Sequence, residues 1–336
     1  MGKKKVRIGL SGGIDSTIAA YLLKESGYDV MGYTLVFGPW GRSTSDAETA
    51  AEELGIPLEI IDAERVFRQK IIAPFVEEYR QGRTPSPCPL CNPLKFTLGL
   101  EITGEEGSLL SSGHYAIIAR GGLWASPHDK DQSYFLARLP HTLLSRMILP
   151  LGEMTKEEVR VFAAKMKLSV AGKNDSQDIC FVPEGDYRAF LQNEGLEGVC
   201  GDAVDEAGHF LCRHDGYFHY TRGQRFRLGG TAERLYVLES VPSRNRLVIG
   251  PDERLYTDRL EGDGFLPLTS EEDLKGPLLA KVRSRDSFHL CRALISGDSF
   301  VLEFENKIRA ATPGQLAVLY KKRDEGLEVV GSGWIL

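Results

Sequence analysis

The sequence predicts an α/β protein with an N-terminal parallel sheet, a small central domain and a C-terminal antiparallel β-barrel. Two observations lead to this fold class. Residues 6–61 alternate between apolar runs of strand length and segments with helical spacing, which is the pattern of a Rossmann-like βαβαβ unit. From about Cys200 onward, short alternating segments separated by Gly, Pro, Asn and Asp are typical of antiparallel strands. We therefore expect domains at residues 1–186, 187–255 and 256–336.

The strands of the first domain are expected at Val6–Leu10, Val30–Phe37, Leu58–Ile61 and Ser108–Ser112. In the last domain they are expected around Leu290–Ile295, Phe300–Glu305 and Leu316–Tyr320, where apolar and polar residues alternate.

Helices are predicted from their start and stop signals. The first is expected from near Thr17 to Gly27, and the second follows a capping box of Ser45 and Glu48 and ends at Gly55. Further expectations are a long helix at Glu64–Arg80, a proline-rich loop at Thr84–Pro93, and a helix at Lys156–Met166 after a capping box of Thr155 and Glu158.

The composition and net charge of the chain limit the classes of function that it can have. The chain has 336 residues, 42% of them hydrophobic and 26% charged, which is ordinary for a globular protein of two or three domains. No apolar run approaches membrane-spanning length and Met1–Lys5 does not resemble a signal peptide, so we expect a cytoplasmic protein without membrane contact. The net charge of -6 means that a nucleic-acid partner would need a local basic surface.

Residues Ser11–Ser16 read Ser-Gly-Gly-Ile-Asp-Ser between the first strand and the first helix. In one interpretation this is a tight turn in which Asp15 or Ser16 caps the helix. In the other, Ser11, Gly12, Gly13 and Ser16 surround a pyrophosphate while Asp15 holds Mg²⁺. The motif lacks the endings of kinase-type and dinucleotide-binding loops. It matches the PP-loop of ATP pyrophosphatases, which use ATP to adenylate an oxygen and release pyrophosphate.

Three of the six cysteines have informative surroundings. Cys88 and Cys91 form a Cys-Pro-Leu-Cys segment, and Cys180 follows the polar run 174–178. Nearby Lys95 and Lys173 would favour reactive thiolates. Structural zinc would require a second ligand pair that the sequence lacks. Nucleophilic cysteines and a three-cysteine iron–sulfur site with one open iron remain as alternatives. Cys291, in a strand-like segment, is expected in a core.

The motifs as a set resemble those of the tRNA-specific 2-thiouridylases, over nearly the whole chain and in the same order. They are the PP-loop, Arg83–Asn92 with Lys95-Phe96, Gly113–Ala116, Lys130–Leu136, Pro150–Gly152 with Thr155-Lys156, Asp175–Phe181, Thr221–Arg225 and Thr312–Gln315. The resemblance implies ATP-dependent replacement of the C2 oxygen of the wobble uridine of tRNA by sulfur. Its implied partners are tRNAs for Lys, Glu and Gln, and a persulfide donor, either a cysteine desulfurase or a relay protein.

The resemblance also implies roles for the cysteines. Cys180 resembles the cysteine that receives the persulfide and attacks the adenylated uridine, and Cys91 resembles the partner that releases sulfur by forming a disulfide with Cys180. Many members have aspartate where this chain has Cys88. That departure favours a [4Fe–4S] variant ligated by Cys88, Cys91 and Cys180, and both schemes remain open.

Further implied site residues are Gly113 and His114 near the nucleotide. Implied tRNA contacts, whose alternative is an ordinary solvated surface, are Lys130, Gln132, Arg222, Gln224, Arg225, Arg283 and Arg285. The family's loop between Val36 and Ser45 is usually longer than the segment 37–42 of this chain.

Two other functions are compatible with parts of this pattern. One is a PP-loop ligase that adenylates a small carboxylate or amide. The other is a non-catalytic RNA-binding protein with a degenerate nucleotide fold, against which the intact Ser11, Asp15 and Ser16 argue.

Overall fold

The computed structural model describes residues 3–41, 43–101, 107–166, 168–172, 179–182, 185–230 and 233–336. Lys173 and the motif residues 174–178 before Cys180 lie outside this part of the chain. Contacts divide the chain into two compact units. The first comprises Met1–Lys70, Cys88–Phe181 and Lys321–Val330, and the second Ile71–Pro87, Val182–Tyr320 and Gly331–Leu336.

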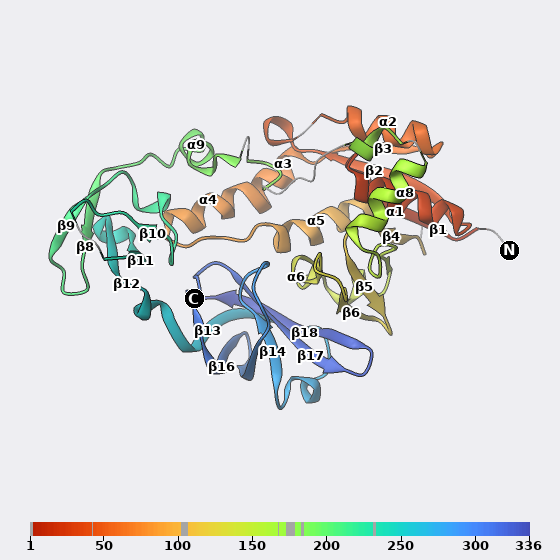
Figure 1. Cartoon of the computed structure of the whole chain (residues 1–336). Helices are drawn as coiled ribbons and strands as arrows, with labels where there is room; N and C mark the ends of the chain where they lie inside the picture. The colour runs from red at the N-terminus through yellow and green to blue at the C-terminus, as the bar shows by residue number, and fades with distance from the viewer. Residues whose placement is uncertain are drawn as a thin grey trace. The chain divides into compact units, whose positions relative to one another are not determined.

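A parallel five-stranded sheet forms the centre of the first unit (Figure 1). Its order is β3-β2-β1-β4-β7, with β1 at Lys5–Gly9, β2 at Asp29–Val36, β3 at Leu58–Asp62, β4 at Leu109–Ser111 and β7 at Met147–Ile148. Each neighbouring pair is parallel, as the alternation of strands and helices predicts. The predicted α/β class of this domain is therefore confirmed.

Helices α1 (Ile14–Glu25), α2 (Ser45–Leu54) and α8 (Lys156–Lys165) pack together and bury one side of β1. Val6 and Ile8 alternate along β1 toward this core, beside Ile18 of α1 and Val159 of α8, all completely buried. Helix α5 (Cys88–Glu101) packs on β1 and β4. Ligands of such sheets bind at the carboxyl ends of the strands, which is where the Ser11–Ser16 loop begins.

Two of the helix starts differ from prediction. Helix α1 begins at Ile14 after Gly13, so Asp15 and Ser16 lie inside the helix and do not cap it. Helix α2 starts at Ser45 with Thr44 as its N-cap, and Thr44 Oγ1 bonds the carboxylate of Glu48 and no backbone amide, so the predicted Ser45–Glu48 capping box is wrong. The Thr155–Glu158 capping box of α8 is confirmed. Gly55 ends α2 in the left-handed conformation, with φ of 58°.

The region after β3 shows the largest local difference. The predicted helix Glu64–Arg80 consists of α3 (Glu64–Phe67), a π-helical segment η2 (Arg68–Ile72) and α4 (Ala73–Arg80). The predicted loop Thr84–Pro93 is wrong in its second half, because α5 begins at Cys88. Proline is tolerated in the first turn of a helix, where its missing amide has no partner to lose, so Pro89 is no barrier to the helix.

The remaining secondary-structure elements of the first unit are short. They include the hairpin β5 (Ala116–Ala119) and β6 (Gly122–Ala125), with helices α6 (Ser133–Leu136) and α7 (His141–Leu144). Glu328 from the outer part of a C-terminal hairpin pairs with Trp124 of β6. Among the described residues, no helix is long and apolar enough to cross a membrane.

The second unit contains helix α9 (Tyr187–Asn193), capped by the Asp186 carboxylate, and a five-stranded sheet in the order β10-β11-β12-β8-β9. The strands are β8 (Gly201–Val204), β9 (Phe210–His214), β10 (Arg225–Phe226), β11 (Leu235–Val241) and β12 (Arg246–Pro251). Ala203, Val237 and Leu247 are completely buried in its core.

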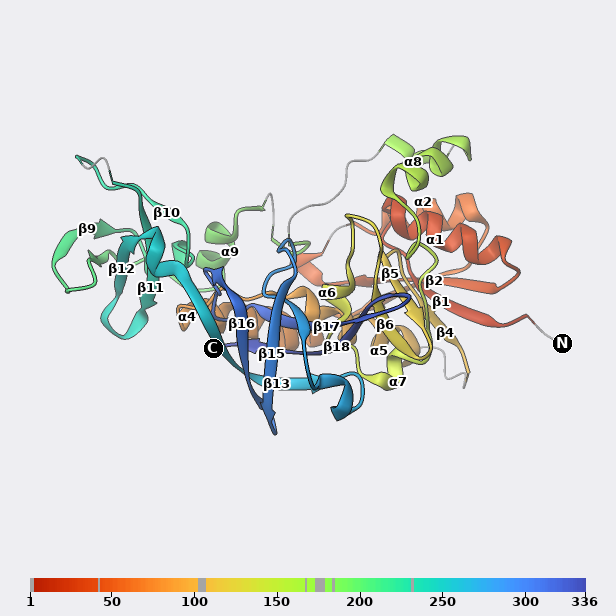
Figure 2. The same cartoon turned by 60° about the horizontal axis from the view of Figure 1, so that its bottom comes forward.

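The C-terminal strands close into a six-stranded antiparallel barrel (Figure 2), as predicted. They are β13 (Tyr256–Pro267), β14 (Leu278–Lys281), β15 (His289–Ser296), β16 (Ser299–Arg309), β17 (Leu316–Arg323) and β18 (Gly326–Ile335), in the order β13-β16-β15-β14-β17-β18. Pairing of β13 with β18 closes the barrel. Cys291 of β15 is 3% exposed, in agreement with its predicted core position.

Candidate active site

The Ser11–Ser16 loop is fixed by its own serines. Ser16 Oγ accepts a hydrogen bond from the Ser11 amide at 3.2 Å and donates to the Gly13 carbonyl at 3.1 Å. Gly12 has φ of +69°, and a Cβ added there would lie 2.3 Å from the Asp46 backbone. The loop therefore requires glycine at position 12 for its backbone conformation and for its close approach to α2.

Gly13 is the N-cap of α1, and no side chain in the described part of the chain caps the helix there. The amides of the first turn have no carbonyl partner within their own helix. The positive end of the helix dipole points in the same direction, so the start of α1 has the features of an anion site.

The Asp15 carboxylate is surrounded by three donors from distant parts of the chain. Tyr115 Oη donates to Asp15 Oδ1 at 2.7 Å, and Lys156 Nζ donates to the same oxygen at 2.6 Å. Lys130 Nζ lies 3.5 Å from Oδ2 and 5.2 Å from the centre of the Tyr115 ring. Asp15 thus joins the loop to the segments that contain Tyr115, Lys130 and Lys156.

Gly113 and His114 lie beside this loop. A Cβ added to Gly113 would be 2.6 Å from both the Asp15 carbonyl carbon and the Ser16 nitrogen, so only glycine permits this contact. The half-buried His114 has its Nδ1 2.8 Å from Ser112 Oγ. Burial lowers the pKa of His114 to about 4, and the charge of Lys95 adds to this effect while Asp15 opposes it. His114 is therefore neutral at physiological pH.

The lowered pKa of His114 predicts a contribution to acid sensitivity. Because the folded chain binds this proton less readily than the unfolded chain, the contribution is absent above pH 6.5 and grows as the pH falls to about 4. We expect His114→Gln to flatten the fall of Tm across this range, measured by scanning calorimetry. His141→Gln, at an exposed position of the same unit, is the control. An identical pH dependence of Tm for wild type and His114→Gln would contradict the prediction.

Helix α5 brings two cysteines and one lysine to the same side. Cys88, Cys91 and Lys95 are spaced i, i+3 and i+7, so they follow one helix face. The Lys95 ammonium hydrogen-bonds the Cys91 thiol and interacts electrostatically with Cys88 and Cys180. Burial raises the pKa of Cys88 to about 12 and also raises that of Cys91, and in both cases the charge of Lys95 opposes the increase. The expectation that Cys91 lies on a loop is wrong.

Cys180 lies in the described segment 179–182, next to Phe181, which is only 2% exposed. The Phe181 ring packs edge-on against Phe67 at 5.6 Å, and Phe67 stacks on Phe37 at 3.9 Å. Phe181 thus anchors the segment while Cys180 itself stays exposed. Phe37 begins the shortened segment 37–42, in which Gly38–Trp40 form a 3₁₀ turn and Arg42 lies outside the described residues.

The environments of these thiols predict their order of alkylation. At about pH 8, iodoacetamide is expected to modify the exposed Cys180 and Cys200 before Cys88 and Cys91, because thiols with raised pKa contain little reactive thiolate. Peptide mass spectrometry over a time course measures the order, and a urea-unfolded sample is the control. Equal rates for Cys91 and Cys200 in the folded protein would refute the assignment.

The described residues contain no group of three or more His, Cys, Asp or Glu side chains arranged to hold a metal ion, and their cysteines are free thiols. Cys88 and Cys91 are both within electrostatic range of Cys180, but the three thiols are not assembled into a ligand set. The iron–sulfur site stays a prediction.

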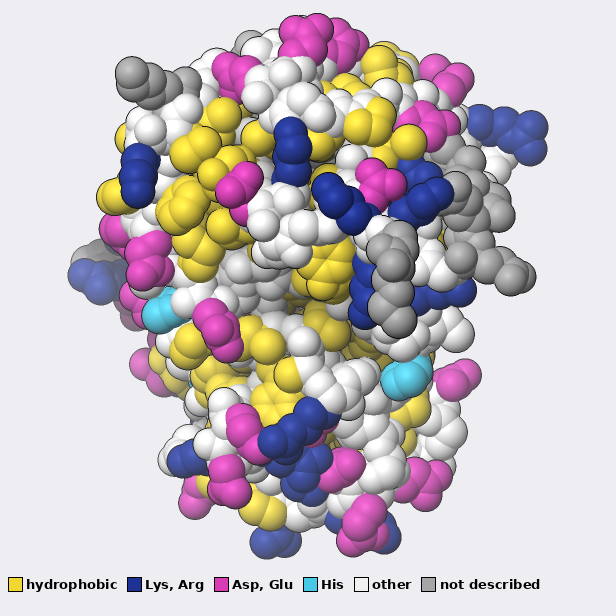
Figure 3. Space-filling view, turned by 90° about the vertical axis from the view of Figure 1, so that its right-hand side faces the viewer, with side chains coloured by type: hydrophobic (Ala, Val, Ile, Leu, Met, Phe, Trp, Pro, Cys, Tyr) yellow, Lys and Arg dark blue, Asp and Glu magenta, His cyan; other side chains and the backbone are white. Residues whose placement is uncertain are grey.

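The predicted tRNA contacts fall into two groups. In the first unit, Gln132 Oε1 accepts a hydrogen bond from the Tyr115 amide at 3.0 Å, near Lys130 and Asp15. In the second, Arg222 donates to the Leu238 carbonyl and Arg283 to the Ala310 carbonyl, so these two guanidinium groups also hold the local fold. The remaining predicted contacts, Gln224, Arg225 and Arg285, are exposed. Basic and acidic side chains are interspersed on the face in Figure 3.

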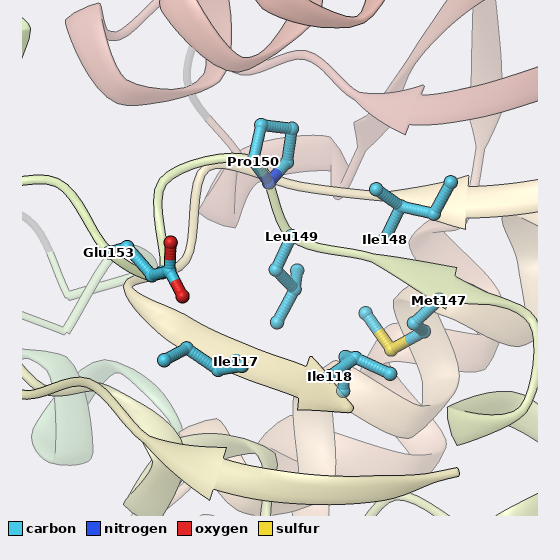
Figure 4. A pocket seen from close by; sticks show the side chains of 8 residues that line it. Ile117, Ile118, Met147, Ile148, Leu149, Pro150 and Glu153 are labelled. Carbon is cyan, nitrogen blue, oxygen red and sulfur yellow. The ribbon is translucent and has the colours of Figure 1, made fainter. Parts of the chain in front are cut away.

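A separate pocket, to which several apolar side chains contribute, lies between β5 and the segment from β7 to Glu153 (Figure 4). Ile117 and Ile118 line one side, and Leu149 projects toward them from the segment after β7. Pro150 and Gly152 of the Pro150–Gly152 motif line this pocket, but none of the catalytic, nucleotide or tRNA residues predicted from the sequence does. The candidate site is instead the surroundings of Asp15, His114 and helix α5.

Sequence reasoning missed two members of this site, the hydroxyl of Tyr115 and the ammonium of Lys156. Both lie in segments that carry the family resemblance. The contacts to Asp15 span 100 and 141 residues, so no local spacing reveals them.

Comparison with known proteins agrees with this arrangement. The chain matches the tRNA methyl transferase HUP domain over residues 4–184, the tRNA methyl transferase PRC-barrel domain over 188–251 and the aminomethyltransferase beta-barrel domain over 267–335.

Among its relatives, the tRNA-specific 2-thiouridylase MnmA of Acidithiobacillus ferrooxidans is 41% identical, covering 100% of this chain and 99% of that protein. The proteins of the same name from Lachnoclostridium phytofermentans and Geobacter metallireducens are 39% and 38% identical, each covering 99% of this chain and 99% and 97% of their own lengths. Similarity of this extent along the whole length shows that the chain belongs to the tRNA-specific 2-thiouridylase family.

Proposed function

We propose that this protein uses ATP to replace the C2 oxygen of the wobble uridine of tRNA by sulfur. The observation that carries the proposal is that one unit contains both the Ser11–Ser16 loop, which leads into the uncapped start of α1, and the cysteine helix α5, with His114 next to both. His114 interacts electrostatically with Asp15 of the loop and with Lys95 of α5. A reaction that needs both a phosphate site and a sulfur nucleophile accounts for this proximity.

The uridine C2 oxygen is a poor leaving group, and adenylation converts it into AMP, which leaves readily. In our proposal the loop residues Ser11, Gly12, Gly13 and Ser16 bind the phosphates of ATP through the amides at the start of α1. Gly113 and His114 border the nucleotide. Attack of the C2 oxygen on the α-phosphate forms the adenylated uridine and releases pyrophosphate.

Sulfur then replaces the adenylated oxygen at C2, and the other bonds of that carbon stay unchanged. We propose that Cys180 carries a persulfide whose terminal sulfur attacks C2 and displaces AMP. Cys91 next attacks the Cys180 sulfur, which releases 2-thiouridine and leaves a Cys91–Cys180 disulfide that an external thiol reduces. The exposure of Cys180 suits loading by a donor protein, and Lys95 suits stabilisation of the Cys91 thiolate.

Asp15 fits a single carboxylate ligand to Mg²⁺, which in nucleotide sites commonly takes one or two carboxylates together with phosphate oxygens and water. Oδ1 accepts the short hydrogen bonds from Tyr115 and Lys156, whereas Oδ2 has the longer 3.5 Å contact to Lys130. The bound ion would neutralise charge on the phosphates.

A [4Fe–4S] form of the reaction is the second candidate. Cys88 in place of the usual aspartate, on the same helix face as Cys91, favours it. The described residues do not assemble three thiols around a metal position, so we derive no step through a cluster. Iron and acid-labile sulfide analysis after anaerobic purification tests it: a stoichiometric cluster lost in Cys88→Ser supports this form, and an active iron-free protein excludes it.

We propose that residues 1–186 form the catalytic domain and that residues 187–255 form a tRNA-binding domain. Residues 256–336 form the C-terminal β-barrel domain. The three matched domain families support this division. Binding of the tRNA backbone is assigned to Lys130 in the first unit and to Arg225 and Arg285 in the second, with Gln224, Arg222 and Arg283 of the second unit in supporting roles. Gln132 is assigned to the edge of the target base. Substrates are tRNAs for Lys, Glu and Gln, the sulfur donor is a cysteine desulfurase or relay protein, and the compartment is the cytoplasm.

The test is reconstitution of the reaction with unmodified tRNA, ATP, MgCl₂ and a cysteine desulfurase with cysteine, followed by nucleoside mass spectrometry. We expect 2-thiouridine only when ATP is present. Absence of product with an active donor, combined with pyrophosphate release stimulated by a small carboxylate or amide, would instead identify a ligase. Absence of any ATP turnover would favour a non-catalytic RNA-binding protein.

A further inference from the structure

Lys156 is directed away from its own helix and toward the nucleotide loop. It is the first residue of α8, its Nζ donates to Asp15 Oδ1 at 2.6 Å, and its side chain is only 11% exposed. The ammonium group therefore lies beside the first turn of α1, among residues that are 141 positions away in the sequence.

The helix itself gives no reason for a lysine at this position. The start of a helix carries partial positive charge, which favours acidic residues and disfavours lysine. Helix α8 follows this rule at Glu157 and Glu158, and Glu158 completes the capping box with Thr155. Lys156 is the basic exception in that first turn, and its contact with Asp15 accounts for its presence.

Two ammonium groups approach the Asp15 carboxylate. Lys156 Nζ lies 2.6 Å from Oδ1, and Lys130 Nζ lies 3.5 Å from Oδ2. The Tyr115 hydroxyl adds a neutral donor to the same carboxylate. The ammonium groups therefore lie near the backbone amides at the start of α1, where Gly13 has no side chain to cap the helix.

We propose that Lys156 is a phosphate-binding residue of the nucleotide site, which Asp15 holds in position until nucleotide enters. This inference rests on the proposed use of ATP. Lys156 donates a charge-assisted hydrogen bond to a phosphate oxygen of the bound nucleotide, and Asp15 fixes the direction of the ammonium group beforehand.

The competing explanation is that Lys156 only neutralises Asp15, whose charge would otherwise repel the phosphates. A double-mutant cycle separates the two. If Lys156 acts through Asp15 alone, its replacement has no further effect once Asp15 is asparagine. If Lys156 binds phosphate itself, its replacement weakens binding in both backgrounds.

The experiment measures ATP binding by isothermal titration calorimetry to full-length wild type, Lys156→Met, Asp15→Asn and the double variant. Titrations are made with EDTA, to remove the contribution of a cation at Asp15, and repeated with MgCl₂. We expect Lys156→Met to weaken ATP binding about tenfold to a hundredfold in both backgrounds, the range for loss of a charge-assisted hydrogen bond. Lys156→Arg retains most of the affinity.

Lys165→Met, at an exposed position in the last turn of α8, is the matched control and is expected to bind ATP like wild type. Lys156→Gln replaces Lys156→Met if the latter does not fold, as judged by circular dichroism. An effect of Lys156→Met that disappears in the Asp15→Asn background overturns the inference and leaves the proposed function intact. Failure of wild type to bind ATP under either condition counts against the proposed function instead.

Discussion

Replacement of Cys91 by serine is expected to lower the rate of 2-thiouridine formation about a thousandfold or more, as is typical when a nucleophile is removed. The same is expected for Cys180→Ser. In neither variant should ATP binding change by more than about twofold, because α5 and the segment of Cys180 are held by contacts that do not involve these sulfur atoms. Asn92 Nδ2 donates to the Phe135 carbonyl at 2.9 Å beside Cys91, and Phe181 packs on Phe67 beside Cys180.

Product is measured by nucleoside mass spectrometry in single-turnover reactions, and adenylation by tRNA-dependent pyrophosphate release. Cys200→Ser is the matched control, since Cys200 is also an exposed free thiol but belongs to the second unit. Cys88→Ser distinguishes the two sulfur schemes: it should retain activity if sulfur arrives as a persulfide and lose it if a cluster is required. Full activity of Cys91→Ser or Cys180→Ser would rule out the proposed transfer.

Gly113→Ala is expected to reduce kcat/KM for ATP about a hundredfold, the effect of displacing a reacting group by about an ångström. The new methyl group would lie 2.6 Å from the Ser16 nitrogen and from the Asp15 carbonyl carbon. Both are backbone atoms of the first turn of α1, so they cannot move aside as the end of a flexible side chain can. The turn that presents its amides to the phosphates must shift.

Pyrophosphate release at varied ATP concentration measures this effect, and circular dichroism establishes that the variant is folded. Gly172→Ala is the control, because no atom of the described residues, its chain neighbours aside, lies within 4 Å of a Cβ added at that position and its backbone is not in the left-handed region. An unchanged kcat/KM for Gly113→Ala would mean that the contact between Gly113 and the loop does not hold the nucleotide site together.

The parallel sheet and the barrel were predictable because their signals are local. Apolar runs separated by helical segments identify β1 to β3, and alternation along β16 and β17 identifies strands with one buried face. The start of α5 was not predictable from the same signals. Prolines at positions 87, 89 and 93 indicate a loop by composition, yet the chain is helical from Cys88 because packing on β1 and β4 outweighs local preference.

The residues of the candidate site also fall into two groups, those that the sequence identifies and those that it does not. The Ser11–Ser16 loop is a contiguous motif, so its serines, glycines and Asp15 were found from the sequence. The partners of Asp15 lie at position 115 just before β5, at position 130 in a turn and at position 156 at the start of α8, and only the tertiary fold brings them together. The neutral state of His114 likewise follows from burial and from Lys95, neither of which a sequence motif encodes.

The seam between β13 and β18 has a consequence for biosynthesis. Strand β13 is the first strand of the barrel to be synthesised, but its partner β18 is the last of the six, and the Leu336 amide donates to the Glu261 carbonyl at 3.1 Å. Until β18 has been synthesised, β13 therefore has an unpaired edge, the kind of surface that promotes aggregation. A premature stop codon that removes Gly331–Leu336 would make this transient state permanent, so such truncated chains should be substrates for chaperones and proteases even though every proposed active-site residue has been synthesised.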